Sequence, residues 1–229
     1  MNKNIVVVGA SSGIGKALVA CLISHKDTNI FALSRKSGQL KKCFSGAKNL
    51  VCIDFDLTKN VREQLDNSPL SNIQVDYLIN NAGLLVKKDF RTLTQEDFNI
   101  SFQTNAIGVM QTVQALQSNF NPNFAHIVNI STMGALQGSA KFPELIAYGT
   151  SKAALCTFTE VYAEEFKNTQ IRMNCLCLGA VNTDMLKEAF PGFIADVEPN
   201  EMAEFILHFT LHSGRLMNGK ILPISRSTP

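Results

Sequence analysis

The chain alternates short apolar, β-branched runs with longer stretches of helical pattern, and this alternation restricts the possible folds most. Strands are expected at Ile5–Val8, Ile30–Leu33, Leu50–Ile53, Tyr77–Asn80, Ile127–Ile130, Ile171–Cys177 and Lys220–Ile224. Helices are expected at Gly13–Ser24, Leu40–Phe44, Asn60–Leu65, Thr94–Asn119, Ala147–Lys167 and Asn200–His212. Such alternation favours a parallel sheet with right-handed crossovers and helices on both faces. The sequence therefore predicts a single doubly wound α/β domain, residues 1–229, with seven parallel strands.

Composition excludes several classes of protein. The 229 residues are 45% hydrophobic and 17% charged, which suits one large core and not a disordered chain. The net charge of +2 argues against a dedicated nucleic-acid binder. Apolar runs fall short of the ~18–20 residues of a membrane span, and the N-terminal apolar run is too short for a signal peptide. We expect a cytoplasmic protein with no nucleic-acid or membrane partner.

The six cysteines are scattered, mostly within apolar segments. Cys175 and Cys177 have strand spacing, but no second ligand pair accompanies them, as a zinc site would require. The sequence therefore predicts reduced, partly buried thiols and no metal.

Two irregular stretches interrupt the pattern in the second half of the chain. Residues 132–146 precede Tyr148 and are expected to border an active site, since functional residues concentrate on loops. Residues 183–199 contain Pro191-Gly192, which breaks an otherwise helical pattern. Pro223 indicates that the last strand lies at an edge of the sheet.

A glycine-rich segment, Gly9-Ala-Ser-Ser-Gly13-Ile-Gly15, connects the first strand to the first helix. Glycines permit a tight turn and close approach of a ligand, and the helix amides and dipole would face a diphosphate. The spacing is G-x-x-x-G-x-G, not the G-x-G-x-x-G of other dinucleotide-binding proteins. A turn that binds nothing is the alternative, and the position after an N-terminal strand favours a nucleotide.

Tyr148 and Lys152 are four residues apart in an expected helix, so the phenol and the ammonium share one face. A phenol titrates near pH ~10 in water, and a nearby ammonium lowers its pKa. The pair is suited to exchanging a proton with a carbonyl or alcohol oxygen. Many surface helices carry this spacing by chance, so its weight depends on the other motifs.

Together these motifs resemble the short-chain dehydrogenase/reductase family. The resemblance runs from Val7 to about Thr183 and is carried by Gly9–Gly15, Asp56-Leu57-Thr58, Asn80-Asn81-Ala82-Gly83, Asn105-Ala106, Ser131, Tyr148-x-x-x-Lys152 and Gly179-x-x-x-Thr183. It implies a Rossmann-like fold and an NAD(P)-dependent oxidoreductase. Association into a homodimer or homotetramer through Thr94–Asn119 and Ala147–Lys167 is also implied, although the apolar residues of Ala147–Lys167 equally suit packing on the chain's own sheet.

The resemblance assigns a catalytic group of Asn105, Ser131, Tyr148 and Lys152. Tyr148 would donate the proton, Lys152 would lower its pKa and bond the nicotinamide ribose, and Asn105 would bend its helix and hold a water. Ser131 follows the fifth strand, where its hydroxyl could donate to the developing oxyanion. Two features depart from the family: 17 residues separate Ser131 from Tyr148, and Leu178 replaces the usual proline.

The second expected strand ends in Ser34-Arg35, where NAD-binding relatives carry an acid. A guanidinium can hold a 2′-phosphate by two hydrogen bonds, so NADP(H) is expected in preference to NAD(H). Asp56 would contact the adenine, or it could simply begin a helix. The expected cofactor-binding residues are Gly9, Ser11, Ser12, Gly13, Ile14, Gly15, Ser34, Arg35, Asp56, Leu57, Asn81, Ala82, Gly83, Tyr148, Lys152, Gly179, Val181 and Thr183.

The sequence thus favours an NADP(H)-dependent carbonyl reductase or alcohol dehydrogenase acting on a small molecule. A 3-oxoacyl thioester reductase is a narrower alternative, and it predicts a basic patch for an acyl carrier. A nucleotide-sensing protein without turnover is a second alternative, which the complete catalytic group disfavours. A sugar-nucleotide epimerase is disfavoured because the chain lacks the length for an extra substrate domain.

Overall fold

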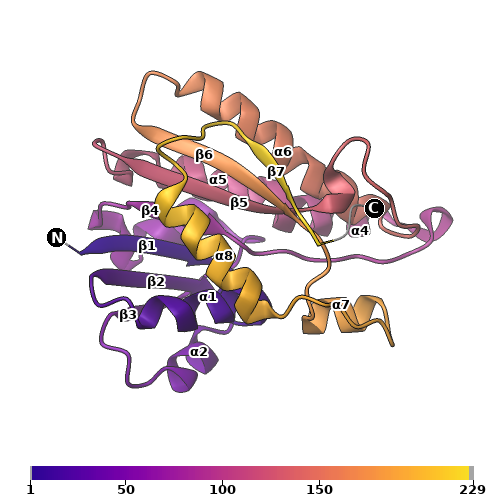
Figure 1. Ribbon diagram of the computed structural model, residues 1–229, viewed down its shortest axis with the longest axis horizontal. Coiled ribbons are helices and arrows are strands. Elements are labelled where there is room, and N and C mark those ends of the chain that lie inside the picture. The colour runs from indigo at the N-terminus through magenta and orange to yellow at the C-terminus, as the bar shows by residue number, and fades with distance from the viewer. Residues whose placement is uncertain (1, 227–229) are drawn as a thin grey trace.

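The computed structural model describes residues 2–226 and contains a seven-stranded parallel sheet in the order β3-β2-β1-β4-β5-β6-β7 (Figure 1). The strands are β1 (Lys3–Val8), β2 (Thr28–Ser34), β3 (Leu50–Asp54), β4 (Tyr77–Asn80), β5 (Ala125–Thr132), β6 (Ile171–Leu178) and β7 (Ile221–Ile224). All seven expected strands are present, and the doubly wound fold is confirmed. Pro223 lies in β7 at the sheet edge, where its missing N–H is tolerated.

Helices cover both faces of the sheet. The longer ones are α1 (Gly13–Ile23), α2 (Ser37–Cys43), α3 (Val61–Asp66), α4 (Gln95–Phe102), α5 (Gly108–Ala115), α6 (Ile146–Glu165), α7 (Asp184–Ala189) and α8 (Pro199–His212). Helices α1 and α8 cross one face, whereas α5 and α6 lie behind the sheet in the same view (Figure 1). Short 3₁₀ turns occur at Pro69–Asn72, Phe90–Thr92, Gln117–Asn119 and Met133–Ala135.

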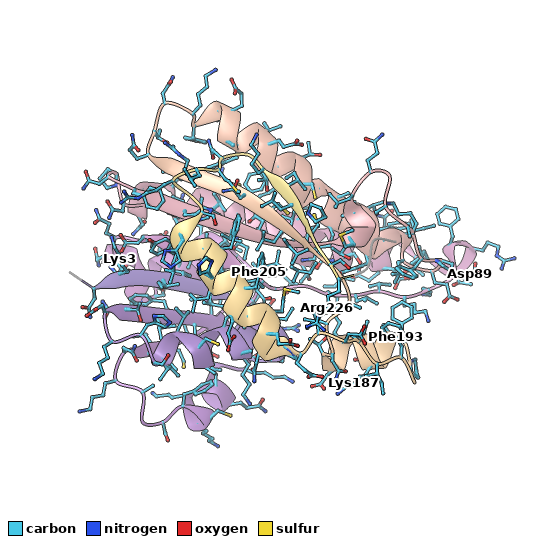
Figure 2. All side chains as sticks on the ribbon, viewed as in Figure 1. Lys3, Asp89, Lys187, Phe193, Phe205 and Arg226 are labelled. Carbon is cyan, nitrogen blue, oxygen red and sulfur yellow. The ribbon has the colours of Figure 1, made fainter. Side chains whose placement is uncertain are left out.

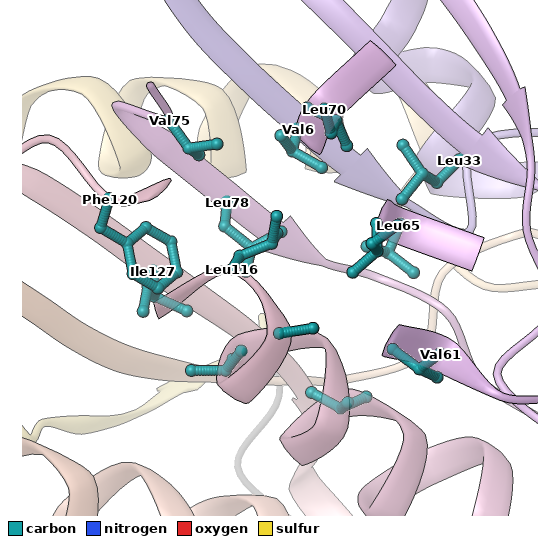
Figure 3. Close-up of a cluster of buried hydrophobic side chains, with 14 of the residues drawn as sticks. Val6, Leu33, Val61, Leu65, Leu70, Val75, Leu78, Leu116, Phe120 and Ile127 are labelled. Carbon is teal, nitrogen blue, oxygen red and sulfur yellow. The ribbon is translucent and has the colours of Figure 1, made fainter. Parts of the chain in front are cut away.

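Alternation along the strands divides the core into two clusters. Val6 and Val8 point into the cluster under α3, α5 and α6, which Figure 3 shows around Leu78 and Ile127. Ile5 and Val7 point to the opposite face, under α1 and α8. Because both faces are buried, the strands read as continuous apolar runs instead of alternating ones.

The expected single helix Thr94–Asn119 is interrupted. Thr94 caps α4 in a capping box with Asp97, and a π-helical turn, Gln103–Ile107, separates α4 from α5. Asn105 lies in this turn, and its side chain bonds the backbone of Leu84. π-Turns of this kind recur at functional sites because the extra residue redirects a side chain.

Residues 183–199 are more ordered than expected, because they contain α7. Thr183 caps this helix by accepting a hydrogen bond from the Leu186 amide at 3.3 Å. The helix ends before Pro191-Gly192, and Gly192 has φ +84°. Among residues 2–226, no helix combines the length and the hydropathy that a membrane crossing demands.

Candidate active site

A cleft of about 800 Å³ opens at the carboxyl ends of the strands. Ligands bind at this edge in doubly wound sheets because the loops that follow the strands converge there. Sixteen of the residues expected to bind a cofactor, together with Tyr148, line the cleft: Gly9, Ser11, Ser12, Gly13, Ile14, Ser34, Arg35, Asp56, Leu57, Asn81, Ala82, Gly83, Lys152, Gly179, Val181 and Thr183. Gly15, the last residue of the glycine loop, is buried against the Gly9 carbonyl and is not one of the residues that line the cleft.

The glycine loop packs so closely on its neighbours that Gly9 and Gly15 have no room for a side chain. Gly9 has φ +82°, and a Cβ there would lie 2.6 Å from the Ala82 backbone. A Cβ on Gly15 would lie 2.0 Å from the Gly9 carbonyl oxygen. The Asn81 amide donates to that same carbonyl at 3.1 Å. Ser12 precedes α1 and makes no side-chain cap, which leaves the first amides of the helix, beside the cleft, for a ligand.

The far end of the cleft lies at the end of β2. The Ser34 hydroxyl is buried there and, within residues 2–226, has no hydrogen-bond partner, so it offers a donor and an acceptor to a ligand. Asp54, paired with Ser34 in the sheet, instead accepts a hydrogen bond from Ser37 at 2.6 Å. Arg35 is exposed at the rim of this end.

Asp56 lies close to Arg35. Burial alone would raise the pKa of Asp56, but hydrogen bonds from Thr58 and the charges of Arg35 and Lys59 outweigh it and lower that pKa. The phosphate cradle, the unpartnered Ser34 hydroxyl and the basic rim therefore fit a dinucleotide phosphate.

Helix α6 presents Tyr148 and Lys152 at the centre of the cleft. The Lys152 ammonium donates to the carbonyls of Ala82 at 3.1 Å and Ile130 at 2.9 Å, at the ends of two neighbouring strands. Burial lowers the pKa of Lys152 to about 8, against an opposing effect of three nearby cysteines.

The expected lowering of the Tyr148 pKa by Lys152 is not observed. Burial instead raises the pKa of Tyr148 to about 12, and a hydrogen bond with Thr132 opposes this in part. The reason is geometric, since Lys152 is directed toward two backbone carbonyls instead of the phenol.

The structure separates the roles of Ser131 and Thr132, which are adjacent at the end of β5. The Ser131 hydroxyl is buried and donates to the Lys152 carbonyl at 2.9 Å, within helix α6. Thr132 interacts with the Tyr148 phenol. Successive strand residues point in opposite directions, so only one of the two can face the phenol. Thr132 was not predicted as a site residue from the sequence. A second hydroxyl next to Ser131 was the signal that could have identified it.

Asn105 holds the loop behind Lys152. Its carbonyl oxygen accepts from the Leu84 amide at 2.7 Å, and its NH₂ donates to the Leu84 carbonyl at 2.8 Å and to Ser151 at 3.0 Å. A Cβ on Gly83 would lie 3.3 Å from the Lys152 nitrogen and 3.7 Å from the Asn105 oxygen. The two side chains therefore flank Gly83.

The turn after β6 closes the other side of the cleft. The Gly179 amide donates to the Ile224 carbonyl at 2.8 Å, and a Cβ on Gly179 would meet Ser225 at 2.5 Å. Thr183 lies beside Gly13, whose Cβ would be 3.2 Å from the Thr183 methyl group. The turn thus joins the glycine loop and α7.

Aromatic side chains from the two irregular stretches form the outer wall of the cleft, and the sequence analysis did not single them out. Phe142 and Phe190 meet edge to face with centroids 6.3 Å apart, and the Lys87 ammonium lies 4.5 Å from the Phe190 ring centroid. Phe193 also lines the cleft, and Figure 2 shows it on the projecting segment that carries Lys187. Phe142 and Phe193 are both more than half exposed.

Comparison with known proteins agrees with this geometry. The model of the family described as short chain dehydrogenase matches residues 3–192. Carbonyl reductase family member 4 of Xenopus laevis is 30% identical, with 93% of this chain and 92% of that protein covered. The 3-oxoacyl-[acyl-carrier-protein] reductase FabG of Chlamydia trachomatis is 26% identical, with 82% and 77% covered.

A solved structure gives the same result for the whole fold. The short chain dehydrogenase family protein from Francisella tularensis superposes with a TM-score of 0.83 at 26% identity, and 98% of each chain is covered. The family match spans the glycine loop, Tyr148 and Lys152. The chain therefore belongs to the short-chain dehydrogenase family of nucleotide-binding oxidoreductases.

Proposed function

We propose that this protein is an NADP(H)-dependent carbonyl reductase or alcohol dehydrogenase acting on a small, largely apolar substrate. The observation that carries the proposal is the placement of Tyr148, Thr132 and Lys152 in one cleft with the glycine loop. The carbonyl reductase relative supports the same reaction class.

The cofactor supplies the hydride, and the protein supplies the proton and the orientation of the substrate. Tyr148, whose pKa is raised to about 12, is protonated at neutral pH and can donate to the substrate oxygen during reduction. The Thr132 hydroxyl interacts with the Tyr148 phenol and can stabilise negative charge that develops on the substrate oxygen. Lys152 holds the ends of two strands and can bond a ribose hydroxyl, while Asn105 fixes the loop behind it.

The preference for NADP(H) is supported by the end of β2. Arg35 is exposed at the rim, Ser34 offers an unpartnered hydroxyl, and Asp54 is occupied by Ser37. A 2′-phosphate beside Ser34 would therefore meet a guanidinium. The glycine loop and α1 would hold the diphosphate.

The aromatic walls of the cleft are the evidence for an apolar substrate. Phe142, Phe190 and Phe193 surround the entrance, and they offer a hydrophobic surface for the part of the substrate beside its carbonyl.

A 3-oxoacyl thioester remains the narrower candidate, favoured by the similarity to the acyl-carrier-protein reductase. Three basic side chains near the entrance are already paired with acids, which disfavours an acidic carrier at these positions. Lys87 pairs with Glu144 at 3.6 Å, and Lys88 pairs with Asp97 at 2.7 Å. Arg91 pairs with Asp89, which Figure 2 labels at the right-hand tip of the molecule. Positive charge with an acidic partner attracts an acidic protein less.

The test is NADPH oxidation with a panel of ketones, aldehydes and 3-oxoacyl thioesters, run beside fluorescence titrations of NADPH and NADH. We expect turnover of apolar carbonyls that disappears in Tyr148→Phe, while NADPH binding persists. Tight NADPH binding without turnover across the panel would indicate nucleotide sensing. Equal binding of NADH would overturn the role given to Arg35.

A further inference from the structure

Three cysteine side chains meet directly beneath the catalytic helix. Cys175 and Cys177 point from β6 to one face, and Cys156 faces them from α6, one turn after Lys152. The three sulfur atoms are buried and lie within 4.8 Å of one another. The sequence predicted no metal because Cys175 and Cys177 lacked further ligands, and the tertiary structure supplies Cys156.

The spacing of these sulfurs suits a shared ion. The Cys156 and Cys177 sulfurs are 3.7 Å apart. Two thiolates bound tetrahedrally to zinc at about 2.3 Å lie about 3.8 Å from each other. A disulfide requires about 2.05 Å, so the sulfurs would have to move much closer to form one. Thiolates are also the ligands that soft divalent cations prefer.

The Lys152 side chain lies close enough to this cluster for its charge to act on all three cysteines. A divalent ion with three thiolates carries a net charge of −1, which the Lys152 ammonium would balance. The Ser131 hydroxyl, 3.8 Å from the Cys156 sulfur, lies where a fourth ligand could come from.

We propose that Cys156, Cys175 and Cys177 bind one zinc-class divalent cation, and that its binding inhibits the enzyme. Three metal–sulfur bonds form, and the thiol protons are released to solvent. The fourth position draws on Ser131, whose hydroxyl otherwise donates to the Lys152 carbonyl. Binding thus disturbs the helix and strand that position Tyr148, Lys152 and Thr132.

The first experiment titrates the reduced full-length protein with cadmium and follows the thiolate-to-cadmium charge-transfer absorbance. We expect a band that saturates at one equivalent. Cys156→Ser should bind more than about tenfold more weakly and lose about a third of the band, because one of three thiolates is gone. Cys177→Ser should behave in the same way. Cys21→Ser and Cys43→Ser, which lie outside the cluster, should match the wild type.

The result that overturns the proposal is an unchanged band in Cys156→Ser, or no band at one equivalent in the wild type. Thermal melting and NADPH binding establish that each variant is folded, and Cys156→Ala replaces any serine variant that is not. Competition with zinc, measured as the release of bound cadmium, tests the same site in the unmodified protein. Turnover should fall with cadmium in the wild type and not in Cys156→Ser. This last arm alone rests on the proposed reductase activity, so its failure is separable from failure of binding.

Discussion

The Thr132 side chain contacts the Tyr148 phenol, whereas the adjacent Ser131 hydroxyl donates to the Lys152 carbonyl 2.9 Å away. Two neighbouring hydroxyls thus have different partners, one in the cleft and one inside helix α6. Under the proposed mechanism, Thr132 lies beside the proton donor, whereas Ser131 supports helix α6.

Thr132→Ala should lower kcat by about 10²–10³-fold, as expected when a donor to a developing oxyanion is removed. Thr132→Ser should retain most activity because it keeps the hydroxyl. Ser131→Ala is the matched control and should affect melting temperature more than kcat. Steady-state kinetics of the three variants test whether Thr132 stabilises the oxyanion. A larger loss of kcat in Ser131→Ala would assign that role to Ser131 instead.

Arg35→Ala should raise the KM for NADPH by about 10–100-fold, since hydrogen bonds to a charged group contribute about 1.5–3 kcal/mol. The KM for NADH should change little, because NADH has no 2′-phosphate. Lys42→Ala removes another exposed positive charge, on helix α2, and should leave both values unchanged. A parallel increase for both cofactors would show that Arg35 acts on something other than the phosphate.

Stability should fall in acid because of His126, which is buried in the core. Its Nδ1 lies 2.8 Å from the Thr210 carbonyl and its Nε2 lies 2.9 Å from the Asn174 NH₂, an arrangement that fits the neutral ring protonated at Nδ1. Burial lowers its pKa from 6.5 to about 4, although the Thr210 carbonyl opposes this.

The unfolded chain therefore binds a proton on His126 between pH 6.5 and about 4, and the folded chain does not. The stability present above pH 6.5 is lost as the pH falls through this window, by an amount on the order of 3 kcal/mol. Urea unfolding of wild type, His126→Gln and the exposed control His25→Gln measures this. The slope of the free energy of unfolding against pH, between pH 6.5 and about 4, should be smaller only in His126→Gln. Equal slopes in all three proteins would exclude His126 as the cause.

Gly15→Ala should destabilise the protein by about 2 kcal/mol or more, because the added carbon would lie 2.0 Å from the Gly9 carbonyl. Gly38→Ala is the matched control in helix α2, where a Cβ meets nothing within 4 Å. It should instead stabilise the protein by up to about 1 kcal/mol. Urea denaturation measures both changes. Similar stability of the two variants would contradict the close contact.

The family resemblance suggests association of copies through α6 and the Thr94–Asn119 segment, and the contribution of α6 is open to test. Val161 is 58% exposed on this helix, while Leu155 is buried against the chain's own core. We expect a dimer or tetramer by light scattering, weakened by Val161→Glu. Phe205→Glu changes a 41% exposed apolar residue on α8, on the opposite face, and serves as the control. A monomeric wild type would rule out this association.

The strand and helix alternation, the glycine loop and the Tyr148–Lys152 spacing were readable from the sequence because each depends on residues close in the chain. Apolar β-branched runs, positive φ at glycine and one-turn spacing are local properties. For this reason all seven strands and the position of the cleft were predicted correctly. Element ends differ by a few residues, as at β5, because terminal hydrogen bonds depend on neighbouring strands.

The tertiary structure decided what each side chain faces. The Asn105 side chain, in the π-turn, bonds the backbone of Leu84, which lies 21 residues away in sequence. The direction of Lys152 depends on carbonyls at the ends of β4 and β5, so the pKa of Tyr148 could not be derived from helical spacing alone. Whether Ser131 or Thr132 meets the phenol depends on the orientation of one strand end toward α6. The third thiol beside Cys175 and Cys177 likewise comes from a helix distant in sequence, because contacts between elements are set by packing and not by local pattern.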